Sequence, residues 1–169
     1  MLVHGGHLME LWDIYDINRN KTRRKHKRGV PLSAGDYHLV VHVWLVNKKG
    51  EILLTKRQQN KPHPNLWECP GGSVLAGENS LEGAIREVKE EIGIDLSKCN
   101  GKLIKSERRD VFNDFYDAWL FNQSVEITDI TLQQEEVSDV KWVTKSELEH
   151  IYKSNNLVPT LSYFKILYH

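Results

Sequence analysis

Hydrophobic positions along the chain follow two periods, which predict several strands separated by a few helices. Residues 37–46 (YHLVVHVWLV) are rich in β-branched and aromatic side chains, so they predict a strand, and residues 51–56 (EILLTK) predict a returning strand after a turn. Further strands are predicted over residues 10–17, 103–107, 115–121 and 137–143, and helices over residues 79–92, 144–152 and 158–167. Because strands dominate and helices interrupt them irregularly, the expected fold class is α+β in layers.

Alternation within the first long strand places two histidines on one face. His38 and His42 share that face with Val40 and Trp44, because side chains alternate across a strand. Two histidines at this spacing are able to bind a metal ion. A half-buried, hydrogen-bonded pair of histidines is the alternative, and we favour it.

Residues 79–92 combine a buried stripe with an acidic face. Leu81, Ala84, Ile85, Val88 and Ile92 fall within one arc of the helix, and the carboxylates of Glu87, Glu90 and Glu91 occupy another. Asn79 with Glu82 predicts a capping box, and Gly93 predicts the helix end. Carboxylates at this spacing repel one another. They indicate either a solvated acidic face or a site for a hard divalent cation, which prefers oxygen ligands.

The preceding loop favours the cation site. Counting from Gly72, the chain has five residues, Glu78, seven residues, and then the run Arg86-Glu87-Val88-Lys89-Glu90-Glu91-Ile92-Gly93-Ile94. This string resembles the Nudix box, G-x5-E-x7-R-E-U-x-E-E-x-G-U, where U is aliphatic, and every specified position matches. Trp67 before Cys69-Pro70-Gly71-Gly72, and a late Trp142-Val143 segment, extend the resemblance over most of residues 37–150.

The resemblance implies an α/β/α sandwich around a mixed sheet and hydrolysis of a diphosphate linkage with Mg2+ or Mn2+. By position, the metal ligands are Glu87, Glu90, Glu91 and the carbonyl of Gly72. Arg86 then orients a glutamate, for which Glu87 is the preferred candidate, and Glu78 supports the loop. A metal ion neutralises phosphate charge and acidifies a bound water, from which a nearby carboxylate removes the remaining proton. Candidates for this base are Glu87 and Glu90 in the helix, and Glu135 and Glu136 in a later loop, where simple solvation is the alternative.

Residues 37–67 resemble one branch of the family, the isopentenyl-diphosphate isomerases and their hydrolase-like relatives. In that branch the position of His38 is a metal ligand, and the positions of Arg57 and Lys61 contact the diphosphate. We therefore expect Arg57 and Lys61 to bind substrate, with plain surface charge as the alternative. Trp67 is a further substrate-binding candidate, as are Phe112, Phe115 and Tyr116, although core packing is the favoured role for such aromatic side chains.

The isomerase chemistry itself is not supported by the residues. The isomerase cysteine falls at Gly71 and a metal-binding histidine at Ser73, and its later glutamate pair falls near Asp114 and Tyr116. Cys69 is two residues away and is expected to point elsewhere. The hydrolytic box is complete, so hydrolysis is preferred. The alternatives are an isomerase and a Nudix-like module that binds a nucleotide without turnover.

Composition adds few constraints. The 169 residues carry 23 basic and 23 acidic side chains, so no net charge attracts the chain to nucleic acid or to a membrane. We expect one domain over residues 1–169, with an N-terminal arm at 1–36, a cytoplasmic location and a small-molecule diphosphate as partner. The basic run 21–28 predicts a solvated loop in preference to a binding surface, and exchange of the arm between subunits would produce a homodimer.

Overall fold

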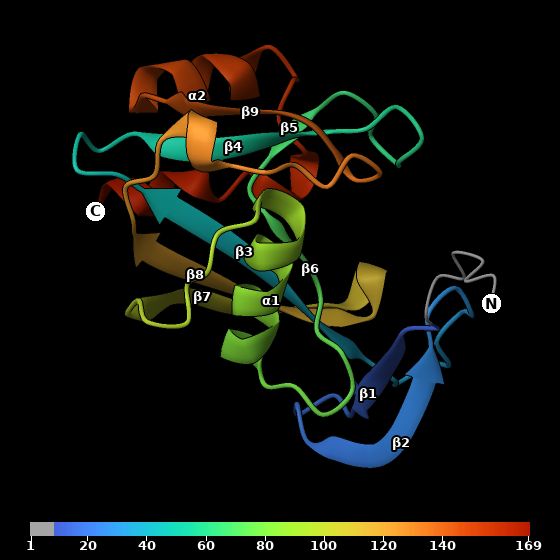
Figure 1. Cartoon of the computed structure of the whole chain (residues 1–169). Helices are drawn as coiled ribbons and strands as arrows, with labels where there is room; N and C mark the ends of the chain where they lie inside the picture. The colour runs from blue at the N-terminus through green and yellow to red at the C-terminus, as the bar shows by residue number, and fades with distance from the viewer. Residues whose placement is uncertain (1–8) are drawn as a thin grey trace, which may run out of the picture.

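The computed structural model describes residues 9–169, in which a seven-stranded mixed sheet lies between helical layers (Figure 1). The sheet has the order β5-β4-β3-β8-β7, with β6 paired to β3 and β9 paired to β4; only β3 and β8 run parallel. Its strands are β3 (His38–Val46), β4 (Ile52–Arg57), β5 (Trp67–Glu68), β6 (Gly71–Ser73), β7 (Gly101–Arg109), β8 (Asp114–Asn122) and β9 (Val137–Val143). The helices are α1 (Ser80–Ile92), α2 (Lys145–Lys153) and the short 3-10 segments η1 (Asp110–Phe112), η2 (Ile127–Asp129), η3 (Pro159–Leu161) and η4 (Phe164–Tyr168).

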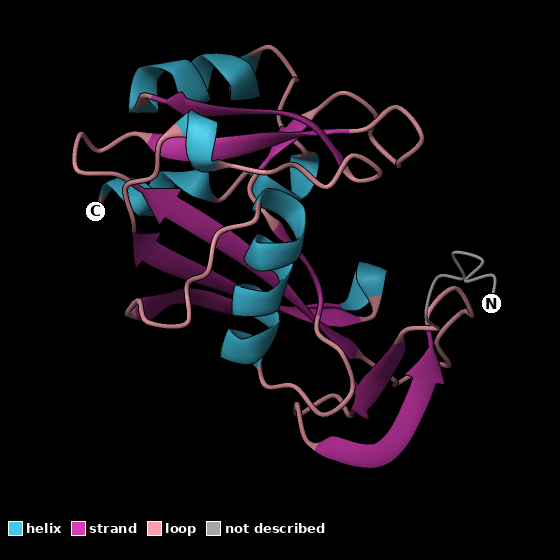
Figure 2. Cartoon of the chain, viewed as in Figure 1, coloured by secondary structure: helices cyan, strands magenta, loops and turns pink. Residues whose placement is uncertain are grey.

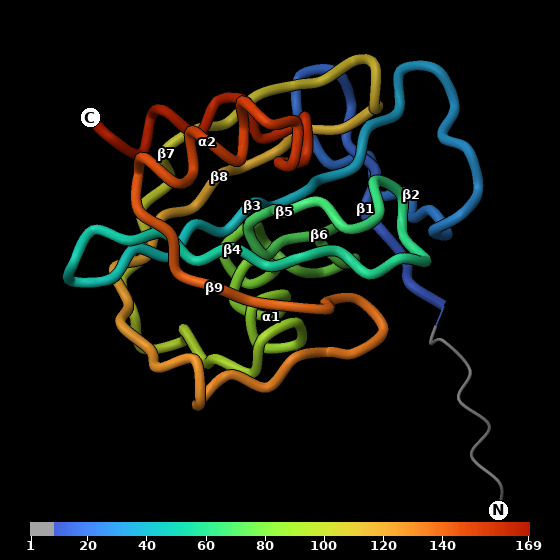
Figure 3. The backbone as a smooth tube through the Cα atoms, turned by 90° about the horizontal axis from the view of Figure 1, so that it is seen from above, coloured from blue at the N-terminus to red at the C-terminus, as the bar shows by residue number. Residues whose placement is uncertain are grey.

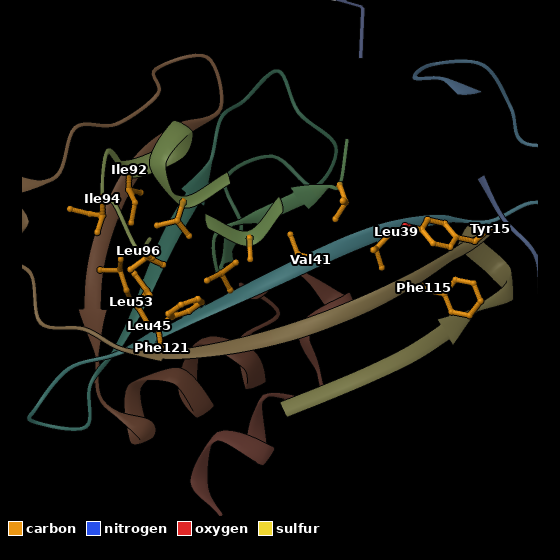
Figure 4. Packing of buried hydrophobic residues seen from close by; sticks show 14 of the residues in the cluster. Tyr15, Leu39, Val41, Leu45, Leu53, Ile92, Ile94, Leu96, Phe115 and Phe121 are labelled. Carbon is orange, nitrogen blue, oxygen red and sulfur yellow. The ribbon is translucent and has the colours of Figure 1, made fainter. Parts of the chain in front are cut away.

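Two hydrophobic clusters lie between the sheet and the helices, and the alternation of β3 explains both. Figure 2 shows the strands of the sheet and the helices around them. Leu39, Val41, Val43 and Leu45 point toward α1, and Figure 4 shows labelled members of this cluster gathered along β3. Trp44, on the opposite face, packs in the cluster that also holds side chains of α2, η3 and η4. The expected α+β sandwich is therefore confirmed, because each face of the sheet buries its apolar side chains under a different helical layer.

The expected pair of strands, β3 and β4, is joined next to its turn and diverges with distance from the turn. β3 and β4 are paired only at Val46 and Ile52, next to the turn. Beyond that point β3 is bonded to β8 and β6, whereas β4 is bonded to β9 and β5, so the two strands diverge. Figure 1 shows this divergence, and the widest cavity at the candidate site lies between the separated ends.

The N-terminal arm is a β-hairpin that docks on its own chain. β1 (Leu11–Tyr15) pairs with β2 (Lys21–Lys27), and the pairing of Tyr15 with Tyr37 joins the hairpin to the start of β3. The prediction of a solvated loop over residues 21–28 was therefore wrong, because the run gains backbone partners from β1 even though its side chains stay mostly exposed. Figure 3 shows the hairpin beside the main sheet; residues 1–8 lie outside the described part.

The C-terminal prediction needs a second correction. Helix α2 begins after Thr144 with the expected capping box, but residues 158–167 form two short 3-10 segments instead of one helix. Val158 is not helical (φ −54°, ψ 127°), because its backbone N–H donates to the carbonyl of Trp67. The next residue, Pro159, has no N–H to donate. Over residues 9–169, no helix is long and apolar enough to cross a bilayer.

Candidate active site

Helix α1 presents its acidic face to the loop that precedes it. The Asn79–Glu82 capping box starts the helix, and Gly93 ends it in the left-handed conformation (φ 74°), as expected from the sequence. Ala84, Val88 and Ile92 are fully buried against the sheet. This burial fixes the rotation of α1 and directs the acidic face toward β6.

Glu87, Glu90 and Glu91 line one small cavity of about 90 Å³ together with Gly72. Glu91 is only 7% exposed, and its Oε2 is a buried oxygen without a hydrogen-bond partner in the described part of the chain. A buried carboxylate oxygen of this kind is costly unless a cation or a donor satisfies it. The donor set, all of oxygen, therefore fits a divalent cation.

Arg86 holds the acidic face together and ties it to the loop. Its Nε donates to both carboxylate oxygens of Glu78, at 3.1 and 2.8 Å, and its Nη2 donates to the carbonyl of Ser73 at 3.0 Å. Its Nη1 donates to Glu87 and to Glu90, each at 3.1 Å. Glu78 in turn accepts the backbone N–H of Leu75 at 2.8 Å, which places it as a support of the loop.

The contacts with Arg86 occupy two of the carboxylates, those of Glu87 and Glu90. Within residues 9–169, no three His, Cys, Asp or Glu side chains are grouped closely enough to hold a metal ion as they stand. The Glu90 side chain is 49% exposed, so it is free to leave Arg86. A cation site that includes Glu90 would therefore need this side chain to turn away from Arg86.

Burial and mutual repulsion raise the pKa values of the inner glutamates. Burial raises the pKa of Glu87 to about 7, against the opposing effect of Arg86. Burial and the neighbouring Glu87 raise the pKa of Glu91 well above its ordinary value. A cation in this cavity would stabilise the charged form of both groups and reverse the direction of these shifts.

Gly72 is required by a close approach between β6 and α1. A Cβ on Gly72 would lie 2.5 Å from Oε1 of Glu87. Gly72 pairs with Val41 of β3, so its backbone has no freedom to retreat. Because Gly72 has no Cβ, its backbone is able to lie directly beside the Glu87 carboxylate.

A wider cavity of about 340 Å³ continues from the small one and carries most of the positive charge. Arg28, Arg57, Lys61, His63 and Arg109 line it, together with Glu68, Glu91, Gly72 and apolar side chains such as Val40, Val158 and Leu161. The two cavities share Arg28, Lys61, Gly72 and Glu91 in their linings, so carboxylates and cations surround one connected region.

The two predicted phosphate-binding cations are both in this space, and each is paired with a carboxylate. Arg57 Nη1 donates to Glu68 at 3.1 and 2.9 Å, and Arg57 Nε donates to the carbonyl of Pro62. Lys61 lines both cavities and forms an ion pair with Glu136. An anionic ligand would therefore compete with Glu68 and Glu136 for these cations.

The structure separates the remaining site predictions. Glu136 lines the small cavity, whereas Glu135 is exposed and outside both cavities. Trp67 is also outside both, and its ring instead contacts Lys141 and Lys56, whose Nζ atoms lie 4.1 and 5.7 Å from the ring centre. The expectation that Cys69 points elsewhere was wrong: it lines the wider cavity with Gly71, since alternate residues of an extended segment share a side.

The isomerase-like positions hold other contacts. Asp114 forms a bidentate ion pair with Arg109, at 2.7 Å for both bonds, and Tyr116 donates to Glu107. Burial raises the pKa of the Cys69 thiol well above its ordinary value, which keeps it neutral. Phe115 and Tyr116 are buried, whereas Phe112 is exposed and stacks with Arg109.

The two histidines have different environments, although both are buried. His38 stacks on Trp12 of the hairpin, with ring centres 4.0 Å apart, and lies outside both cavities. His42 lines the wider cavity, and its Nδ1 lies 2.6 Å from the hydroxyl of Tyr163. Both histidines are buried, as we expected. Only His42 has the expected hydrogen bond, because Nδ1 of His38 has no partner among the described residues.

Sequence reasoning missed several residues of the site. Arg28 and Glu10 reach it from the hairpin, where they form an ion pair at 2.6 Å, and Arg109 reaches it from the end of β7. The basic run contained the signal for Arg28, but its position depends on docking of the hairpin. Glu68, Gln133 and Tyr163 carried no local signal.

Comparisons with known proteins agree with this geometry. The family model of the NUDIX domain matches residues 36–163. A Nudix hydrolase of Listeria innocua, lin0387, is 44% identical over 153 residues, which cover 89% of each chain. The chain therefore belongs to the Nudix hydrolase family, whose members act on pyrophosphate bonds.

Solved structures show the same fold. The crystal structure of DR0079 from Deinococcus radiodurans superposes with a TM-score of 0.73 at 19% identity, covering 88% of this chain and 92% of that one. The MutT protein from Methanosarcina mazei Go1 gives a TM-score of 0.58 at 29% identity, covering 78% and 89%.

Proposed function

We propose that this protein is a Mg2+- or Mn2+-dependent hydrolase that cleaves the diphosphate linkage of a small molecule, such as a nucleoside diphosphate joined to another group. The observation that carries the proposal is the unpartnered, buried Oε2 of Glu91 in the cavity that Glu87, Glu90 and Gly72 also line. Glu87, Glu90, Glu91 and the Gly72 carbonyl would hold the ion. When bound, the ion supplies neutralisation of phosphate charge and acidification of a water molecule.

The chain's own residues divide the remaining work. Arg86 and Glu78 keep the loop and helix in register, so that the carboxylates remain beside Gly72. Arg57 and Lys61 would bind the phosphate oxygens and give up their bonds to Glu68 and Glu136. Release of Glu136 from Lys61 would leave a carboxylate at the small cavity that is able to accept a proton from water, so we favour Glu136 over Glu135 as the base.

The wider cavity indicates what kind of substrate fits. Its cations suit a polyanion, and its volume of about 340 Å³ suits a small molecule rather than a polymer. The apolar side chains of Val40, Val158 and Leu161 would contact the group joined to the diphosphate. The protein would act on a small-molecule diphosphate without any partner from nucleic acid or membrane.

The test is a panel of diphosphates incubated with the protein and Mg2+ or Mn2+, with phosphate or phosphomonoester release as the readout. Glu91→Gln should lower kcat at least 100-fold while the circular dichroism spectrum and Tm show that the fold is kept. Glu126→Gln, the same change at an exposed position, is the matched control and should keep full activity.

Other results of this panel would contradict the proposal. If Glu91→Gln keeps its turnover, the assignment of Glu91 as a metal ligand is wrong. Tight binding of the panel members without turnover by the wild-type protein would favour a module that only binds nucleotides. Conversion of isopentenyl diphosphate to dimethylallyl diphosphate would favour the isomerase alternative. For the base, Glu136→Gln should lower kcat strongly and Glu135→Gln should not.

A further inference from the structure

His42 lies in the wall of the wider cavity, between the sheet and the C-terminal segment. It is 8% exposed, and its ring stacks on those of Tyr116 and Tyr163, with centres 4.9 and 5.7 Å away. The three rings form one cluster, since the centres of Tyr116 and Tyr163 are themselves 5.4 Å apart, and this packing limits rotation of the His42 ring. Neither the Nudix box nor the roles assigned above use this side chain.

A chain of hydrogen bonds specifies which ring nitrogen carries the proton. The indole Nε1 of Trp44 lies 3.1 Å from the hydroxyl oxygen of Tyr163, and indole N–H is only a donor. The phenol therefore accepts from Trp44, and its own proton is available for Nδ1 of His42 at 2.6 Å. In this arrangement Nδ1 is the acceptor, so a neutral His42 carries its proton on Nε2.

The opposite tautomer leaves a group without a partner. If Nδ1 carried the proton and donated to Tyr163, the phenol would accept two bonds and its own proton would need a third partner. The described residues offer the Tyr163 hydroxyl no partner besides Trp44 and His42. Tyr163 is half-buried, and a hydroxyl shielded from water without a partner costs up to about 1–3 kcal/mol. The Nε2–H tautomer is therefore the more stable one.

Nε2 of His42 has no hydrogen-bond partner among the described residues. It is also not among the fully buried polar atoms that lack a partner, so it is exposed to the cavity that His42 lines. We propose that His42 presents a fixed, neutral Nε2–H donor to a phosphoryl oxygen of the substrate, on the side of the cavity away from the box glutamates. This inference rests on the proposed function, since it assigns a binding residue for the same diphosphate. The surrounding Arg57, Lys61 and Arg109 attract an anion, and the hydrogen bond from the neutral Nε2–H would fix the orientation of the bound phosphoryl group.

Tyr163 and Trp44 act through His42, so they are positioning residues. Both belong to the hydrophobic layer opposite α1, and Tyr163 immediately precedes η4. This relay makes the C-terminal segment part of the substrate site, although it lies far along the chain from the box.

The direct test is ¹⁵N NMR of the full chain labelled at histidine, with Mg2+ and methylenediphosphonate as a non-hydrolysable probe. We expect the His42 signals of an unprotonated Nδ1 and a protonated Nε2 before the probe is added, and a shift of Nε2–H when the probe binds. Tyr163→Phe should mix the two tautomers, whereas Tyr168→Phe, which removes another C-terminal hydroxyl, should leave them unchanged. A protonated Nδ1 in the wild-type protein, or a bound probe that leaves the His42 signals unmoved, would overturn the inference.

Kinetics on any panel member that the wild-type enzyme turns over supply the second test. His42→Phe should raise KM about 10- to 100-fold, the usual worth of a hydrogen bond to a charged group, with a smaller change in kcat. His42→Gln, whose amide N–H is able to replace Nε2–H, should recover most of the loss. Equal KM values for His42→Phe and wild type would refute the assignment.

The two proposals fail in different ways. If the wild-type protein turns over no diphosphate and does not bind methylenediphosphonate, the proposed function is wrong and the role of His42 falls with it. If turnover depends on Glu91 but the KM of His42→Phe equals that of the wild type, only the inference about His42 is wrong.

Discussion

Arg19, in the turn of the N-terminal hairpin, forms a bidentate ion pair with Asp117 in the middle of β8. The two bonds measure 2.7 and 2.6 Å, and the Asp117 side chain is 1% exposed. The hydroxyl of Ser106 also donates to Asp117 at 2.7 Å. This pair fastens the hairpin to the sheet, and the hairpin in turn carries Arg28 and Glu10 to the candidate site.

Arg19→Met should therefore lower the free energy of unfolding by about 3 kcal/mol, because Asp117 would remain buried without its cation. Arg24→Met is the matched control on the same hairpin. Its pair with Asp36 is exposed, so its loss should cost less than about 1 kcal/mol. Urea unfolding of the two variants checks this difference, and equal losses would show that docking does not depend on the buried pair.

Acid should destabilise the protein through His38. Burial lowers the pKa of His38 to about 4, below its ordinary value of 6.5. The unfolded chain therefore takes up a proton below pH 6.5 that the folded chain refuses until about pH 4. The stabilisation is complete above pH 6.5 and is lost as the pH falls toward 4, by about 1.4 kcal/mol per pH unit for each such group.

His38→Phe should flatten this dependence and keep the stacking on Trp12. His42 should produce part of the wild-type slope, since burial and Arg109 lower its pKa to about 3. Unfolding free energies measured between pH 7 and 4.5 test both statements. An identical slope in His38→Phe and wild type would contradict the assignment to His38.

Gly72→Ala should reduce activity without unfolding the protein. The new Cβ would displace the Glu87 carboxylate that lies 2.5 Å from its position. A displacement of about 1 Å in a reacting group costs about 100-fold in rate. The kcat of the variant and its affinity for Mn2+, followed by electron paramagnetic resonance, should both fall, and unchanged Mn2+ affinity would argue against Glu87 as a ligand.

Arg86→Lys should also impair the enzyme, although the charge is kept. Lysine has no planar fork with which to reach Glu78, Glu87 and the Ser73 carbonyl together. We expect kcat to fall by at least 10-fold and Tm to drop. Lys89→Arg, an exposed basic change in the same helix, should leave both quantities as they are.

Local patterns in the sequence determined the secondary structure and the acidic half of the site. The apolar spacing and caps of residues 79–92 predicted α1 nearly to the residue, and the alternation along β3 predicted which side chains share a face. Arg86, Glu87, Glu90 and Glu91 are close in sequence, so helical geometry was enough to bring them together, and Glu78 joins them from the adjacent loop. The prediction of one helix over residues 158–167 was wrong, because a hydrogen bond from Val158 to the distant Trp67 outweighed the local helix preference.

Only the tertiary structure decided the cationic half of the site. Arg28, Arg57 and Arg109 come from three different elements, and they meet because β3 and β4 diverge and the hairpin docks on β8. The environment of His42 likewise depends on Tyr163, 121 residues away. Contacts of this kind arise when separate apolar faces are buried against one sheet, so no periodicity along the chain encodes them.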